Sequence, residues 1–312
     1  MSWVNMGVKM LLVVNYHYIR DKIPHTGIHP ITPSFFKKQL ELISTNGYKF
    51  VSVDDINKVL KTNKNTLPEK SCLITFDDGL KESYDIGLSI LDEMGIPAFF
   101  SVISDTIIND KLVDVHKLQY LRTKVDIKDI EYFLSSDIET LDEKSILNQY
   151  PFDDVATAKI KYLLNFVNPE LVDKLFSEFI TTPEKDIANE LYMDKNQIKD
   201  LYDRGFLGTH SKCHKPLATL EDDILFNDIK SSINDIEKLC GGTVDSISYP
   251  YGEKTAVDNR VVDVCEDLGL VSGFTMFRGI NDSNYFLENP FMLKRLDATE
   301  VFGGKYEGKY EL

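Results

Sequence analysis

The 312-residue sequence predicts an α/β fold in which a parallel sheet closes into a distorted (β/α) barrel of seven or eight strands. Short apolar runs of strand length alternate with segments of helical period along most of the chain. Several helical segments are followed by glycine, the residue that commonly ends a helix. The strand–helix unit recurs seven or eight times, which favours a barrel. A doubly wound open sheet is the alternative.

The first third of the chain supplies four predicted strands and the helices between them. The first helix has Thr32 as its N-cap and Pro33 at its first position, and it ends at Gly47. The next two helices carry apolar residues at helical spacing, and the third of the series stops at Gly95. The strands are expected at residues 11–16, 50–53, 71–76 and 98–103.

The same alternation resumes after residue 191. Helices are expected at 194–204, at 221–240 and in a segment that ends at 268, and strands at 206–209, 246–249, 271–275 and 292–296. The stretch at about 105–191 breaks the rhythm, because it is acidic, mostly helical and too long for a plain connection. We therefore expect a single domain over residues 1–312 with a helical insertion, or lid, at about 105–191.

Composition excludes several classes of partner. The net charge of −15 argues against nucleic acid and against an anionic membrane surface. No apolar run is long enough for a membrane span. Four widely spread cysteines without a C-x-x-C pair fit a reducing compartment. Because no basic leader with a cleavage site is evident, we expect a cytoplasmic protein. Nothing in the sequence indicates the oligomeric state.

Three motifs directly follow predicted strands, where active sites form in barrels and open parallel sheets. In the first, TFDDG at 75–79, Asp77 and Asp78 are adjacent carboxylates, which are costly together unless a cation or a proton lies between them. Gly79 allows the bend that lets both side chains reach one site. An exposed Asp-Asp-Gly turn is the alternative.

The second motif, THSKCH at 209–214, places His210 and His214 four residues apart, within reach of one metal ion. With one carboxylate they form a three-ligand site that leaves a position for water, as in catalytic metal sites. The third motif, SYPYG at 248–252, is a stiff turn whose backbone N–H can face a developing oxyanion. Taken singly, these motifs also fit two surface histidines and an ordinary Pro-Gly turn.

In this order, the three motifs resemble those of the polysaccharide deacetylase superfamily (the NodB-homology domain, carbohydrate esterase family four). The segments NYH at 15–17, PSFF at 33–36 and GFLGTH at 205–210 are also similar to family segments. The resemblance covers about 11–109 and 191–296. It implies a distorted β/α barrel and a divalent metal, usually zinc.

Carried over residue by residue, the resemblance implies a role for each motif. Asp77 is the general base, and Asp78, His210 and His214 hold the metal. The backbone N–H of Tyr251 binds the oxyanion. The chemistry is consistent, since a metal ion polarises the amide carbonyl and lowers the pKa of bound water from about 15.7 toward about 7. Asp77 then takes the proton as water attacks.

The sequence also departs from the family pattern. Members often carry an Arg in the third motif, where this chain has Ser248, and a His in the fifth motif, whose counterpart here is LKRLD at 293–297. We predict that Arg295 orients Asp77 through a bidentate pair instead. His17, at the end of the first strand, is the best remaining imidazole for acid duty or substrate binding. A histidine with a purely structural role is the alternative for His17.

The predicted function is removal of an N-acetyl group from an amino sugar, with a cytoplasmic precursor of a surface glycan as the acylated amino-sugar substrate. An O-acetyl esterase, a deformylase or a hydrolase of a non-sugar amide on the same fold is the first alternative. A catalytically inactive, carbohydrate-binding barrel is the second, because the expected acid and the expected Arg are absent from their motifs.

Overall fold

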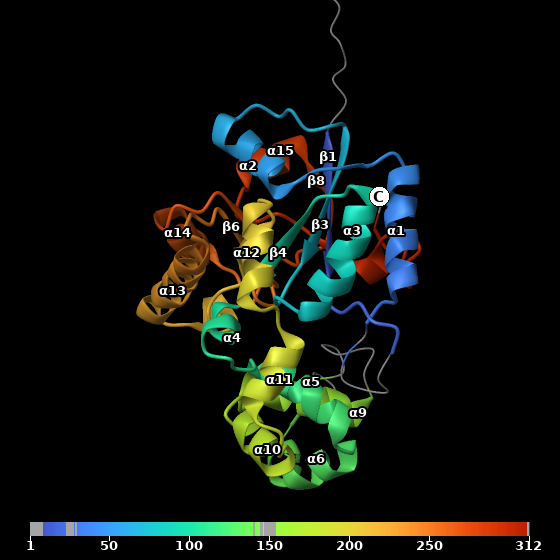
Figure 1. Ribbon diagram of the computed structural model, residues 1–312. Coiled ribbons are helices and arrows are strands. Elements are labelled where there is room, and N and C mark those ends of the chain that lie inside the picture. Colours follow the sequence, from blue (N-terminus) through green and yellow to red (C-terminus); the bar gives the residue numbers. More distant parts are fainter. Residues whose placement is uncertain are drawn as a thin grey trace, which may run out of the picture. The chain divides into compact units, whose positions relative to one another are not determined.

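The computed structural model (Figure 1) describes residues 9–22, 28, 30–139, 141–143, 146, 154–310 and 312. The chain divides into two compact units. The first consists of Met1–Asp21, Pro30–Asn109 and Asn189–Leu312, and the second of Lys22–His29 and Asp110–Ala188. His25 and His29, which the sequence suggests are loop residues, lie outside the described residues.

The first unit is built on one sheet with the strand order β7-β6-β5-β4-β3-β1-β8, in which β2 also pairs with β3 and β9 with β1. The strands are β1 (Met10–Tyr16), β2 (Lys49–Phe50), β3 (Lys70–Phe76), β4 (Ala98–Val102), β5 (Leu207–Thr209), β6 (Ser246–Ser248), β7 (Ser272–Phe274), β8 (Asn281–Asp282) and β9 (Leu296–Asp297). Among the described strands, every pairing is parallel except that of β1 with β8.

The segment at 293–297 joins the two ends of this sheet. Leu293 forms a parallel bridge with Phe274 of β7, and Leu296 pairs with Val14 of β1. Where the sequence predicts a strand at 292–296, Leu293 forms only an isolated bridge and the strand is limited to Leu296–Asp297. The segment nevertheless curls the sheet around on itself, and the predicted distorted (β/α) barrel is confirmed.

Helices pack around the sheet. In the first unit they are α1 (Pro33–Thr45), α2 (Val53–Thr62), α3 (Ser89–Met94) with the preceding π-helical turn η1 (Ser83–Leu88), α4 (Ser104–Ile108), α12 (Lys195–Asp203), α13 (Asp222–Cys240), α14 (Asn259–Asp267) and α15 (Ser283–Glu288). Local sequence sets their starts. Thr32 caps α1 as predicted. Ser52 and Asp55 form a capping box, so Val53 begins α2 and does not extend the predicted strand at 50–53.

Strand alternation separates an inner core from an outer one. Leu11 and Val13 of β1 point into the barrel and cluster with Phe99, Phe274 and apolar residues of α2 and α15. Leu12 and Val14 point outward and cluster with residues of α1 and α3. Since both faces of the strands are buried, their apolar runs are nearly continuous, as in parallel sheets generally. Figure 1 shows α13 and α14 side by side, and their apolar faces share a third cluster with β6.

The described part of the second unit is helical. Its helices are α5 (Asp114–Lys124), α6 (Ile127–Phe133), α7 (Ser135–Ile138), α9 (Val155–Tyr162), η2 (Leu163–Val167), α10 (Leu171–Phe179) and most of α11 (Glu184–Leu191). The buried side chain of Lys117 places its ammonium 2.7 Å from a carboxylate oxygen of Asp173 and 3.2 Å from one of Glu184, which ties α5 to α10 and α11. Among the described residues, no helix is both long and apolar enough to cross a membrane.

Candidate active site

The predicted site residues of the motifs lie at the carboxyl ends of three parallel strands of this sheet. Asp77 and Asp78 follow β3, His210 and His214 follow β5, and Tyr251 follows β6 by three residues. The structure brings Asp78 and the two imidazoles together. All three are buried, with 5%, 2% and 8% of their surfaces exposed. Their potential ligand atoms lie within 4.8 Å of one another, so one ion can touch all three.

The backbone at this end of the barrel is strained. Asp78, Ser211, His214 and Tyr251 have φ values of 73°, 61°, 52° and 62°, in the left-handed region that non-glycine residues rarely adopt. In the described part of the chain, only two other non-glycine residues share this property. Such strain gathers at functional sites, where the surrounding structure holds it in place. At Asp78 it has a clear effect, because it turns two consecutive carboxylates toward one site despite the alternation of a strand.

The spacing within the Asp78–His210–His214 trio fits a tetrahedral ion. The Oδ1 atom of Asp78 lies 3.3 Å from the Nε2 atom of each histidine. Zinc–nitrogen and zinc–oxygen bonds of about 2.0–2.2 Å at tetrahedral angles place two ligand atoms about 3.4 Å apart. The donor set, one carboxylate and two imidazoles, is also typical of catalytic zinc sites.

The tautomer of His210 is fixed by the neighbouring strand. Its Nδ1 lies 2.7 Å from the carbonyl oxygen of Ser248, and because a carbonyl only accepts, Nδ1 carries the proton. In the neutral ring, Nε2 then presents a lone pair to the carboxylate of Asp78. Burial disfavours the imidazolium, but the charges of Asp77 and Asp78 outweigh this effect and raise the pKa of His210. The position therefore favours a positive charge, either a proton or a metal ion.

Four hydrogen bonds from three side chains hold the carboxylate of Asp77. Its Oδ1 accepts hydrogen bonds from the Oγ of Ser101 at 2.7 Å and from the Nη1 of Arg295 at 3.0 Å. Its Oδ2 accepts from the Nη2 of Arg295 at 2.8 Å and from the Nδ2 of Asn15 at 3.1 Å. Burial opposes ionisation, but Arg295, His210 and His17 outweigh it and hold the pKa of Asp77 well below its usual range. Asp77 is thus an oriented, ionised carboxylate beside the trio.

Arg295 makes the bidentate contact with Asp77 that the sequence predicts, and its side chain is fully buried. Its Nε donates to the carbonyl of Thr275 at 2.8 Å, and its Nη1 also donates to Asn15 at 3.0 Å. The backbone N–H of Arg295 donates to the carbonyl of Phe277 at 3.0 Å. The guanidinium that the third motif lacks at Ser248 therefore reaches Asp77 from the segment that closes the barrel.

The remaining predicted residues lie at the edges of this group. The ring of Tyr251 is 5.1 Å from that of His214, measured between centroids. His17 directly follows β1 and is half-buried, and a positive charge on it would lower the pKa of Asp77. His17 is thus within electrostatic reach of the carboxylate.

Sequence reasoning missed Asn15 and Ser101 as partners of Asp77. Strand alternation offers a signal for both. Asn15 continues the inward set of Leu11 and Val13 on β1, and Ser101 continues that of Phe99 on β4. A polar residue in an otherwise apolar inward series, one step from the carboxyl end of a strand, points into the site.

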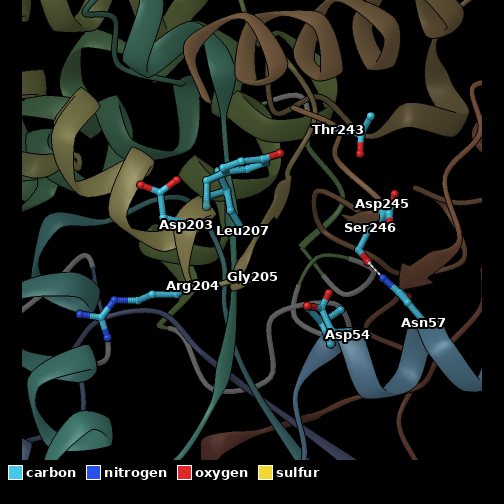
Figure 2. Close-up of a pocket in the computed structure, with 11 residues that line it drawn as sticks. Asp54, Asn57, Asp203, Arg204, Gly205, Leu207, Thr243, Asp245 and Ser246 are labelled. Carbon is cyan, nitrogen blue, oxygen red and sulfur yellow. Dashed lines mark hydrogen bonds between the residues drawn. The ribbon is translucent and has the colours of Figure 1, made fainter. Parts of the chain in front are cut away.

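A polar hollow lies at the opposite end of the barrel, at the amino ends of β5 and β6 (Figure 2). It has a volume of about 490 Å³ and is lined by polar residues that include Asp54, Asp203 and Asp245. The dashed line in Figure 2 is the 2.9 Å hydrogen bond from Asn57 to Ser246. None of the predicted site residues lines this hollow.

Comparisons with known proteins agree with the geometry. The family model described as polysaccharide deacetylase matches residues 64–129 and 147–273, well over half of the chain. The poly-beta-1,6-N-acetyl-D-glucosamine N-deacetylase of Escherichia coli K12 is 25% identical over 131 residues, which make up 42% of this chain. The match spans only 18% of that relative's own length.

Solved structures share the fold. The IcaB protein of Ammonifex degensii has a TM-score of 0.59 at 17% identity, covering 95% of this chain and 94% of that one. The deacetylase PplD of Streptococcus pyogenes has a TM-score of 0.58 at 16% identity, covering 93% of both chains. A de-N-acetylase from Aggregatibacter actinomycetemcomitans reaches 0.60 at 16% identity, covering 96% and 98%. With the motifs on adjoining strand ends and most of the sequence matched by the family model, this chain belongs to the polysaccharide deacetylase family.

Proposed function

We propose that the chain is a metal-dependent hydrolase that removes the N-acetyl group of an amino sugar. The observation that carries the proposal is the pair of 3.3 Å distances from the Oδ1 of Asp78 to His210 and His214, beside a second carboxylate tied to Arg295. Asp78, His210 and His214 would hold the ion, with zinc as the expected species. When bound, the ion supplies polarisation of the amide carbonyl and a lowered pKa for water.

Asp77 acts as the general base in this proposal. Arg295 keeps the carboxylate ionised, and Ser101 and Asn15 fix its direction. Because Arg295, His210 and His17 lower its pKa, Asp77 would accept a proton only from an acidic water, such as one whose pKa a metal ion held by Asp78, His210 and His214 would lower.

Two further residues complete the proposal. The backbone N–H of Tyr251 binds the developing oxyanion, and its turn is held by the hydrogen bond from the N–H of Met276 to the carbonyl of Gly252 at 2.8 Å. His17 protonates the leaving amine, a role supported by its position after β1 and its electrostatic reach to Asp77. The role of Tyr251 rests on the family resemblance, and that of His17 on its position alone.

The similarity to a relative named for N-deacetylation of poly-β-1,6-N-acetyl-D-glucosamine favours an N-acetyl group over an O-acetyl or formyl group. The finer expectations stay predictions: a cytoplasmic location, a surface-glycan precursor as substrate, and one domain over residues 1–312 with an insertion at about 105–191. An inactive barrel is less favoured, because the trio and Asp77 are both intact.

The test is release of acetate or formate from a panel of sugars that carry N-acetyl, O-acetyl or N-formyl groups. We expect acetate from the N-acetyl sugars, and we expect Asp77→Asn to stop the release while the protein keeps its metal. Release from O-acetyl sugars alone would make the chain an esterase. A metal-loaded protein that hydrolyses no member of the panel would support the inactive barrel.

A further inference from the structure

The loop that carries both histidines of the candidate metal site has an unusual backbone. We call residues 210–214 the histidine loop. Ser211 and His214 have positive φ values of 61° and 52°. Non-glycine residues rarely adopt this conformation, and it persists only where the surrounding structure holds it in place. The groups that bind the backbone of the histidine loop therefore also set the directions of its two imidazoles.

One carboxylate binds the middle of the histidine loop. The Oδ1 of Asp228, in α13, accepts a hydrogen bond from the backbone N–H of Lys212 at 2.9 Å, and its Oδ2 accepts one from the N–H of Cys213 at 3.2 Å. These are the two residues between Ser211 and His214, so Asp228 spans the strained stretch. Hydrogen bonds to an ionised acceptor are stronger than those between neutral groups.

Ser232 lies one turn further along α13 and binds the same loop. Its side chain is fully buried, and its Oγ donates to the carbonyl of Ser211 at 3.0 Å. Residues four apart face the same side of a helix, so Asp228 and Ser232 form one polar patch on the buried side of α13. The buried positions beside them, such as Leu225 and Ile229, belong to an apolar cluster.

The burial of Asp228 needs compensation. Only 7% of the residue is exposed, and a carboxylate removed from water is costly unless hydrogen bonds replace the lost hydration. The two N–H groups of the histidine loop supply such bonds. In the described part of the chain, the N–H groups of Lys212 and Cys213 donate only to Asp228. The carboxylate and the two N–H groups thus satisfy one another.

The carbonyls of the histidine loop are bound from a different segment. The N–H of Ser104 donates to the carbonyl of Ser211, and the N–H of Asp105 donates to that of Lys212, each at 3.2 Å. The chain after β4 therefore holds the acceptors of the loop, whereas Asp228 holds its donors. Loss of Asp228 would free the half of the loop that leads into His214.

We propose that Asp228 is a positioning residue, which holds the histidine loop in its metal-binding conformation before an ion arrives. The apparent affinity of a site falls with the fraction of molecules in the competent conformation. Asp228 raises that fraction through the loop backbone, since it is not one of the three residues grouped as ligands. The proposal rests on the proposed metal site and names a further residue on which its affinity depends.

The first test is the affinity for zinc, measured by competition with a chromophoric chelator. Asp228→Asn keeps the shape of the side chain but replaces one of the two acceptor oxygens by a donor. We expect the dissociation constant for zinc to rise about tenfold or more, as for loss of other residues that orient metal ligands. With saturating cobalt, the visible absorption spectrum should match that of wild type, because the ion still gathers all three ligands. An unchanged dissociation constant would overturn the proposal.

Asp235→Asn is the matched control. It removes the same charge from the same helix, but the Asp235 carboxylate reaches the histidine loop only at the ammonium of Lys212, 3.6 Å away. Because this pair is partly exposed, we expect the dissociation constant for zinc to stay within about twofold of wild type. Equal losses in the two variants would show that negative charge, and not the geometry of the loop, sets the affinity.

A second variant covers the case in which Asp228→Asn does not fold, as judged by circular dichroism. Ser232→Ala removes one of the two hydrogen bonds to the carbonyl of Ser211 and leaves the one from Ser104. We expect a smaller rise in the dissociation constant for zinc, of about threefold. A folded Ser232→Ala protein with wild-type affinity would contradict a role for α13 in holding the loop.

Hydrogen exchange separates failure of this proposal from failure of the proposed function. Exchange of the amides at 210–214 is measured in metal-free protein, where no catalysis is involved. We expect the Lys212 and Cys213 amides to be protected in wild type and to exchange about tenfold faster in Asp228→Asn. If wild-type protein releases no acetate but this difference persists, the deacetylase proposal fails and the role of Asp228 stands. If these amides exchange equally fast in both proteins, Asp228 does not order the loop, whatever the activity.

Discussion

Carboxylates lie at both ends of the barrel, but their pKa values are shifted in opposite directions. At the carboxyl ends of the strands, Asp77 is 2% exposed and the fully buried Arg295 holds its pKa below the usual range. At the amino ends, Asp54 lines the hollow of Figure 2. Its pKa is raised by burial and by the neighbouring Asp245 and Asp55, against which Lys61 has the smaller effect.

The two environments therefore shift the pKa of a carboxylate in opposite directions. A buried carboxylate stays ionised only where the fold supplies a cation and hydrogen-bond donors, as it does for Asp77. Of the six described non-glycine residues with positive φ, the four that lie within the motifs are at the carboxyl ends. At the amino ends, the positive φ near the hollow belongs to Gly205, which bears it without strain.

The largest expected contrast is in activity. Asp77→Asn is expected to lower kcat/KM by about 10²–10⁴, the range for loss of a general base, with the metal content unchanged. Asp203→Asn removes a carboxylate from the amino-end hollow and should change kcat/KM by less than about twofold. Steady-state kinetics on folded, metal-loaded protein measure both. Similar losses in the two variants would remove the distinction between the ends.

Arginine substitutions probe the same contrast through stability. Arg295→Met leaves Asp77 buried without its cation, and we expect the free energy of unfolding to fall by about 3–5 kcal/mol. Arg204→Met at the amino-end hollow breaks partly exposed pairs with Asp92 and Asp200, and should cost about 0–1 kcal/mol. Urea denaturation followed by circular dichroism gives both values. An Arg295 variant as stable as the Arg204 variant would contradict the account.

A smaller effect is expected from the hydroxyl beside Asp77. Ser101→Ala removes a 2.7 Å hydrogen bond to a charged group, which is worth about 1.5–3 kcal/mol. We expect a comparable loss in transition-state stabilisation, about 10–100-fold in kcat, if the bond directs the carboxylate. Ser246→Ala, which loses neutral bonds to Asn57 and Ser272, should leave kcat unchanged. An equal change in kcat for the two serine variants would show that Ser101 has no positioning role.

The smallest expected effect concerns Asp54. Because its pKa is raised in the folded state, ionisation of Asp54 opposes folding at neutral pH. Asp54→Asn should therefore leave the stability unchanged or slightly higher, within about 0.5 kcal/mol, and leave activity unaltered. A thermal melt near pH 7 measures the sign. A clear loss of stability would show that the Asp54 carboxylate has a structural partner that favours its charge.

The sequence allowed prediction of most of the barrel, because apolar runs such as 71–76 and glycines such as Gly95 mark the ends of elements locally. The antiparallel strand β8 was missed, since a two-residue pairing carries no periodic signal. A strand was predicted at 292–296, but only Leu296–Asp297 forms one. The pairing of this segment depends on contacts with β7 and β1, which lie far away in the sequence.

Some residues of the site could likewise be predicted from the sequence, and others could not. The motifs located Asp77, Asp78, His210 and His214, because each follows a strand directly. Asn15 and Ser101 were not assigned, since neither residue belongs to a motif and their shared partner is visible only once β1, β3 and β4 are aligned. Arg295 was suggested by the absence of an Arg in the third motif, and its full set of partners follows from the closure of the barrel.

The most direct measurement is the metal content and ligation of the purified protein, by elemental analysis and by a crystal structure with anomalous scattering. The account predicts one divalent ion per chain, bound to Asp78, His210 and His214. His214→Ala should lose it and His17→Ala should keep it. Full metal stoichiometry in both His214→Ala and Asp78→Asn, or an ion bound elsewhere, would contradict the central claim.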